Sequence, residues 1–208
     1  GMVDPNRERT EGAYQYFFKS FLVLSGFAIL TSADILLVKH YFPDSADWVA
    51  KAGTIARTLV YLSIPIVIAM FPKVASPGVM SHVDLKLLRR TMLYVGVIVA
   101  ASLGVAMIWP NPLTYVLYNI WELDPERKDI VRLFLLAMSP LPFTYIIVNF
   151  EMAQHRFKGP LLFAATSIGY VAGVALFHEK VTHMLYVLLS MNLLALVLLL
   201  PVLFVRRS

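Results

Sequence analysis

The sequence predicts an all-α membrane protein, a bundle of six transmembrane helices with both termini in the cytoplasm. Three observations lead to this fold class. Of the 208 residues, 59% are hydrophobic and only 15% are charged, whereas soluble domains average roughly 45–50% apolar and 25% charged residues. The apolar residues gather in six long stretches, and lysine and arginine are distributed unequally between the loops. The loops are too short to separate domains, so residues 1–208 form one transmembrane domain.

Each of the six stretches has at least 18 residues, the length that a membrane helix needs. The first is too long for a signal peptide, and no small-residue cleavage site follows it. Pro110 and Pro112 end the third, and residues 111–120 then form an amphipathic segment at the outer interface. The fifth stretch is the shortest and the last is the most apolar. The spans cover about residues 17–38, 50–71, 87–109, 130–150, 160–177 and 181–205.

The orientation follows from lysine and arginine, which favour the cytoplasmic side. With six spans both termini share one side, which holds 11 of these residues, against 7 on the other side or within spans. The acidic residues of the loops show the opposite preference: Asp44, Asp47, Glu122, Asp124, Glu126, Asp129 and Glu179 all fall on the second side. We therefore expect a multi-pass protein of the cytoplasmic (inner) membrane.

Composition and motifs argue against several other functions. The net charge of +5 fits cationic loops at an anionic membrane surface, and the basic residues do not line one face as a nucleic-acid site requires. There is no cysteine, and no two histidines have metal-binding spacing. Motifs of serine hydrolases, phosphate loops and zinc proteases are missing. We expect no enzyme activity, no catalytic residue, no metal, no cofactor and no nucleic-acid partner.

Charged residues within the first two spans need a physical reason, because a charge in the bilayer is costly. Asp34 is too short to reach water from a full turn inside the first span. Arg57 lies about 10 Å along the second helix, and Thr54, Thr58 and Tyr61 share its face at i, i+3, i+4 and i+7 spacing. One interpretation is an anion site, since guanidinium binds phosphate through two bonds. The other is a buried pair with Asp34, and the two are compatible.

The fourth span is interrupted by Ser139-Pro140-Leu141-Pro142. Each proline removes a backbone hydrogen bond, and the freed carbonyls must find partners within the protein. Broken helices at mid-membrane often mark transporter sites or hinges, so Pro140 and Pro142 are hinge candidates. A passive kink is the alternative. Asn149 and Glu151 are assigned to a cytoplasmic rim at the inner end of this span, and Gly169 and Gly173 are assigned to close helix packing.

Three segments resemble the C-terminal half of polysaccharide (lipid-linked oligosaccharide) flippases of the multidrug/oligosaccharidyl-lipid/polysaccharide exporter superfamily. Residues 34–42, DILLVKHYF, are similar to the outer end of the seventh helix of that family. Arg57 and the segment FPKVAS at 71–76 are similar to an inward arginine and a terminal motif of the next helix. Residues 150–158, FEMAQHRFK, resemble the cytoplasmic turn between the tenth and eleventh helices. Trp48 and Lys51 depart from the family pattern near the outer gate.

The resemblance implies alternating-access transport of a lipid-linked oligosaccharide, a precursor for polysaccharide biosynthesis. Arg57 would contact the pyrophosphate of the polyprenyl carrier, and Asp34 would line the same cavity. Because members have two six-helix halves, the expected partners are membrane lipid, the polyprenyl-pyrophosphate-linked sugar, and an N-terminal half or a second copy of this chain. The alternatives are a multidrug or ion-coupled exporter of the same superfamily, or a non-transporting membrane scaffold subunit.

Overall fold

A computed structural model describes residues 5–75 and 81–203 of the chain, with the side chains of residues 12–69 and 86–201. The described residues form helices and no strand. In chain order the elements are α1 (Pro5–Tyr41), η1 (Pro43–Ser45), α2 (Ala46–Ala75), α3 (Ser81–Ile108), α4 (Asn111–Tyr118), α5 (Pro125–Met138), α6 (Leu141–Ala153), α7 (Lys158–Leu176), α8 (Val181–Leu199) and η2 (Leu200–Leu203).

Six of the described segments are long and apolar enough to cross a membrane, which confirms the predicted number of spans. Most of their bounds lie within a few residues of the predicted ones. The first, second and fourth spans begin five to seven residues earlier than predicted. The last span was predicted to reach residue 205, and residues 204 and 205 lie outside the described part of the chain. The described spans are Gly12–Tyr41, Pro43–Ala69, Lys86–Ile108, Pro125–Ala153, Lys158–Leu176 and Val181–Leu199. The protein is therefore a multi-pass, all-α membrane bundle.

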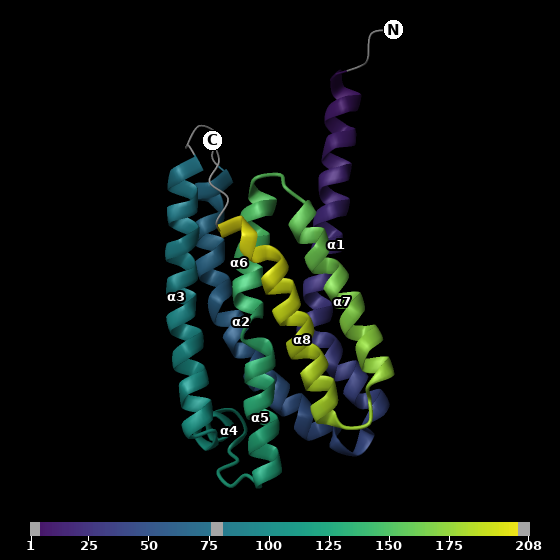
Figure 1. The fold of residues 1–208 in the computed structure, drawn as a ribbon, viewed down its shortest axis with the longest axis vertical. Coiled ribbons are helices and arrows are strands. Elements are labelled where there is room, and N and C mark those ends of the chain that lie inside the picture. The colour runs from purple at the N-terminus through teal and green to yellow at the C-terminus, as the bar shows by residue number, and fades with distance from the viewer. Residues whose placement is uncertain (1–4, 76–80, 204–208) are drawn as a thin grey trace.

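The six spans run alternately up and down, with α5 and α6 following each other in one span, and α1 begins at the same end of the bundle at which α8 finishes (Figure 1). We call this the termini end, and the other the loop end. The three most extensive helix contacts join α1 to α7, α7 to α8, and α2 to α5. Helix α3 lies at the edge, against α2 and α6, with only 22% of its span window buried. The α5–α6 span is the most buried, at 67%, and forms the centre of the bundle.

The predicted break in the fourth span is present, since α5 ends at Met138 and α6 begins at Leu141. Two carbonyl oxygens at the break accept hydrogen bonds from side chains, as a low-dielectric surrounding demands. The hydroxyl of Ser139 donates to the oxygen of Leu136 at 2.8 Å. The side-chain amide of Asn192 on α8 donates to the oxygen of Ala137, also at 2.8 Å. The bond from Asn192 joins the break to α8.

Glycines set two helix contacts, as predicted for residues 169 and 173. A methyl group on Gly169 would lie 3.1 Å from the sulfur of Met191, and one on Gly173 would lie 2.7 Å from Cγ1 of Val187. Both contacts join α7 to α8, so the small residues let these backbones approach closely.

The segment 71–76 that carries part of the family resemblance has its side chains outside the described residues. Helix α2 continues through Ala75. The similar turn at 150–158 is described: α6 closes with His155 in the left-handed conformation, at φ 56°. The amides of His155 and Arg156 donate to the oxygens of Met152 and Glu151, the paired bonds of a Schellman motif.

Candidate functional site

The candidate site lies between α1 and α2, where Asp34 and Arg57 form a buried ion pair. Nη2 of Arg57 donates to Oδ2 of Asp34 at 2.5 Å. Asp34 is 1% exposed and Arg57 is 4% exposed. The predicted pair is therefore confirmed, and neither charge contacts the surrounding lipid.

The guanidinium of Arg57 has two further contacts. Its Nε donates to the backbone oxygen of Thr31 at 2.6 Å, and that carbonyl is within a turn of Asp34 on the same helix. Its Nη1 lies 3.5 Å from the hydroxyl of Thr54, one turn earlier on α2. Charge-assisted bonds of this kind are about twice as strong as neutral ones, so the group is held firmly against α1.

Gly53 gives this pair its space. A methyl group there would lie 2.9 Å from Oδ2 of Asp34 and 3.2 Å from Nη2 of Arg57. It would also lie 3.0 Å from Cζ of Phe134 on α5. Only a residue without a side chain allows α2 to approach the carboxylate and the ring together.

Tyr170 of α7 adds a hydroxyl behind the pair. The side chain is fully buried, and its hydroxyl is within electrostatic range of Asp34 and Arg57. Neither this hydroxyl nor Oδ1 of Asp34 has a hydrogen-bond partner within the described part of the chain. Two polar atoms of the site are therefore unused by the bonds that hold the pair.

The predicted polar stripe on α2 has a buried edge and an exposed edge. Arg57 faces α1, whereas Thr54, Thr58 and Tyr61 are exposed, Tyr61 at 53%. The helix turns about 100° per residue, so residues 57 and 58 occupy opposite edges of any such stripe. The hydroxyl of Thr58 is satisfied by the oxygen of Ile55 at 2.5 Å. Thr54 alone connects the buried cation to the exposed edge.

Two polar residues, Asn192 and Glu151, were not predicted from the sequence to be buried. Asn192 is fully buried and bonded across to α5, whereas Tyr186 and Ser190 of the same helix are exposed. Glu151, which we assigned to a solvated rim, is 8% exposed. An isolated amide in an otherwise aliphatic span was the available signal for Asn192.

A separate pocket of about 290 Å³ lies between α2, α3, α4 and α5. Thr58 and Ser102 are its polar residues, and Arg57 and Asp34 do not line it. The described residues contain no group of three or more side chains suited to hold a metal ion. Comparison of the chain with protein-family models, curated proteins and solved structures found no match.

Proposed function

We propose that this chain is the C-terminal half of a flippase that moves lipid-linked oligosaccharide across the cytoplasmic membrane by alternating access. The observation that carries the proposal is the Asp34–Arg57 pair, buried between the first two spans at 2.5 Å. These are the helices that the sequence resemblance assigns to the substrate cavity. The central broken span between α5 and α6, with Pro140 and Pro142 as hinge candidates, supports it as well.

The chemistry of the pair suits a pyrophosphate ligand. A phosphate presents oxygens to a guanidinium in the geometry that a carboxylate uses. The ligand would take the place of Asp34 as the partner of Arg57, and Asp34 would have to take up a proton or reach water as it is released, because a buried carboxylate without a counter-charge is costly. Thr54 marks the route, because it is exposed and its hydroxyl lies 3.5 Å from Nη1 of Arg57. Substrate binding would then release α1 from α2, which couples the ligand to a helix movement.

The proposal requires partners. The lipid-linked sugar supplies the pyrophosphate, and the polyprenyl chain stays in the bilayer. An N-terminal six-helix half, or a second copy of this chain, would supply the facing wall of the cavity. The exposed side of α2 that carries Thr54 and Tyr61 is the polar surface that such a wall would meet, while Thr58 lines the pocket toward α3.

A non-transporting scaffold is the second candidate, and one observation favours it. The guanidinium of Arg57 already has Asp34 and the oxygen of Thr31 as partners, so a purely structural pair is chemically complete. The two functions differ in what they demand. A scaffold needs the fit of the pair, whereas a flippase needs its positive charge. An ion-coupled exporter would instead require acidic residues in the cavity, and in this pair Asp34 is the only one.

The test is complementation of a flippase-deficient strain with the native gene that encodes this chain. Arg57→Ala should abolish growth, and so should the neutral pair Asp34→Asn/Arg57→Gln, which removes both charges and keeps polar side chains at both positions. Lys51→Ala on the same helix, which removes a partly exposed pair with Asp47, is the control and should complement. Membrane levels of each variant are measured in parallel. Full complementation by the neutral pair would refute the role of Arg57 and favour the scaffold.

A further inference from the structure

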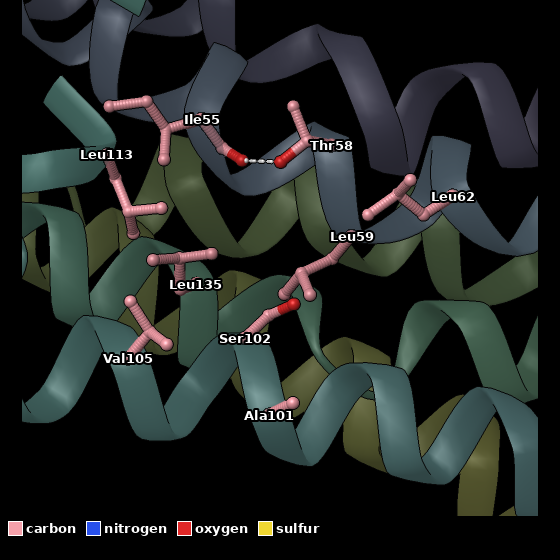
Figure 2. A pocket seen from close by; sticks show the side chains of 9 residues that line it. All are labelled: Ile55, Thr58, Leu59, Leu62, Ala101, Ser102, Val105, Leu113 and Leu135. Carbon is pink, nitrogen blue, oxygen red and sulfur yellow. Dashed lines mark hydrogen bonds between the residues drawn. The ribbon is translucent and has the colours of Figure 1, made fainter. Parts of the chain in front are cut away.

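The pocket between α2, α3, α4 and α5 is a small recess in the wall of the bundle. Its volume is about 290 Å³, at the lower end of the roughly 300–1,000 Å³ typical of small-molecule sites. Figure 2 shows aliphatic side chains around the space, with Ile55 and Leu113 at one side and Leu62 at the other. The lining residues are Ile55, Thr58, Leu59, Leu62, Ala101, Ser102, Val105, Leu113 and Leu135.

The recess has a buried floor and an exposed rim. Ile55, Leu59 and Leu135 form the floor, each at most 2% exposed. Leu62 and Val105 form part of the rim, at 55% and 49% exposed. Leu113 of α4 lines the recess on the side that lies away from the termini end of the bundle. The mouth therefore opens sideways between α2 and α3.

The position of the mouth determines what can enter. The α2, α3 and α5 residues of the lining all belong to membrane-spanning segments. A sideways opening at this depth faces either the hydrocarbon core of the bilayer or a cavity within it. Seven apolar residues from three spans and α4 make a surface that favours contact with an apolar group.

The polar chemistry of the recess is minimal. The hydroxyl of Thr58 is used by the oxygen of Ile55, as the dashed line in Figure 2 shows. Ser102 adds one further hydroxyl. No charged side chain is present to bind a phosphate or a sugar. A lipid headgroup must stay outside, and only a chain can go in.

We propose that this recess binds one acyl chain of a membrane phospholipid, the lipid that surrounds these spans in a bilayer. A polyprenyl chain shares the chemistry that the lining recognises, and the experiment separates the two. The proposal stands apart from the transport function, because a chain can occupy the recess whether or not Arg57 binds pyrophosphate.

The experiment uses the native protein in nanodiscs of phosphatidylethanolamine and phosphatidylglycerol. One arm contains phosphatidylglycerol with a diazirine in an acyl chain, and the other contains a diazirine-bearing polyprenyl phosphate. After illumination, mass spectrometry maps the labelled residues. Label on Leu59 and Leu135 is decisive, because these buried side chains are shielded from lipid that merely surrounds the bundle. Leu93 and Val97, at 64% and 62% exposed, report the surrounding lipid.

Two matched variants test the recess itself. Ala101→Phe fills it from an exposed lining position, whereas Ala100→Phe places the same ring on the neighbouring exposed position that is not part of the lining. Ala101→Phe should lower the label on Leu59 and Leu135 by about tenfold, the factor expected when about two buried methylene groups lose their contact. Ala100→Phe should leave that label unchanged.

Floor label in the phosphatidylglycerol arm supports the proposal, whereas floor label confined to the polyprenyl arm would overturn it. Label confined to Leu93 and Val97 in both arms would overturn it, as would floor label that persists in Ala101→Phe. Equal loss of floor label in both variants would also overturn it, since the effect would then not depend on filling the recess. Monodisperse elution of each variant checks folding.

Discussion

Among the side chains that the structure describes, two carboxylates are buried, and their surroundings differ. Asp34, between α1 and α2, has an arginine at 2.5 Å and is 1% exposed. Glu151, at the termini end of α6, is 8% exposed and forms no salt bridge with another described residue. Its Oε2 also has no hydrogen-bond partner there. Asp34 is stabilised by a full counter-charge, whereas Glu151 has no such partner among the described residues.

Glycine gives each acid its place. Gly53 lies beside Asp34, as described above, and Gly159 lies beside Glu151. A methyl group on Gly159 would lie 2.0 Å from Oε2 of Glu151 and 2.8 Å from Cδ2 of Leu199. Gly159 belongs to the first turn of α7, the positive end of that helix dipole. Glu151 therefore lies next to the partial positive charge of a helix N-terminus, whereas Asp34 lies next to the full positive charge of Arg57.

The difference follows from depth. A charge well inside a span must be neutralised by a formal partner, because removal from water costs several kcal/mol per ion in proteins. A charge at the end of a span remains close to water and to basic groups such as Arg156 of the following turn, which acts on Glu151 electrostatically. A helix end then suffices.

Removal of one partner of the deep pair should have the largest effect. Arg57→Met leaves Asp34 buried without a counter-charge, so the free energy of unfolding should fall by about 3–5 kcal/mol. Reversible SDS unfolding in mixed micelles measures this. The double variant Asp34→Leu/Arg57→Met should recover most of the loss, since apolar replacement of a buried pair is often neutral. If the double variant loses as much as the single one, the pair is not an isolated unit, and Tyr170 must share its role.

The next effect concerns the space beside the pair. Gly53→Ala forces a methyl group against Asp34, Phe134 and Arg57, and such overpacking costs about 1–3 kcal/mol. Gly104→Ala on α3 is the control, because nothing lies within 4 Å of the added carbon, and the change should be neutral or stabilising. Equal stability of the two variants in the SDS titration would contradict the tight approach of α2 to Asp34.

Sequence alone predicted the first member of this comparison and missed the second. The pairing of Asp34 with Arg57 follows from two consecutive antiparallel helices with opposite charges at similar depth. Six spans and the break at Pro140 follow from hydropathy and from the loss of backbone amides. Each of these depends on residues that are local in sequence or joined by one short loop.

The rest depends on contacts between distant segments. Glu151 lies near the start of a loop, so polarity alone placed it at a solvated rim. Only the Schellman turn at His155 folds α7 back so that Gly159 covers it. The separation of Arg57 from Thr58 likewise reflects which neighbour takes each edge of α2. Periodicity gives the relative angle of two residues but not the identity of the helix that each one meets.

A neutral polar group should fall between the two acids in its effect. Asn192→Leu removes the bond to the oxygen of Ala137 at the break between α5 and α6. Side-chain hydrogen bonds within membrane bundles average about 0.6 kcal/mol and reach roughly 1.7. We expect a loss of about 1 kcal/mol in the same titration. Ser190→Ala, two residues away and bonded only within its own helix, should change nothing. A larger loss in Ser190→Ala would show that position on α8 matters more than the bond.

The smallest effect is expected at Glu151. Glu151→Gln removes the cost of burying a charge but also removes its attraction to Arg156 and to the first turn of α7, an attraction of about 0.3–1 kcal/mol. These contributions oppose each other, so unfolding free energy should change by less than about 1 kcal/mol. Gly159→Ala displaces Oε2 of Glu151 from its position. If the charge of Glu151 holds the side chain there, Gly159→Ala should lower the unfolding free energy less in the Glu151→Gln variant than in wild type. A loss in Glu151→Gln as large as that in Arg57→Met would mean that Glu151 has a full counter-charge, and the distinction by depth would fail.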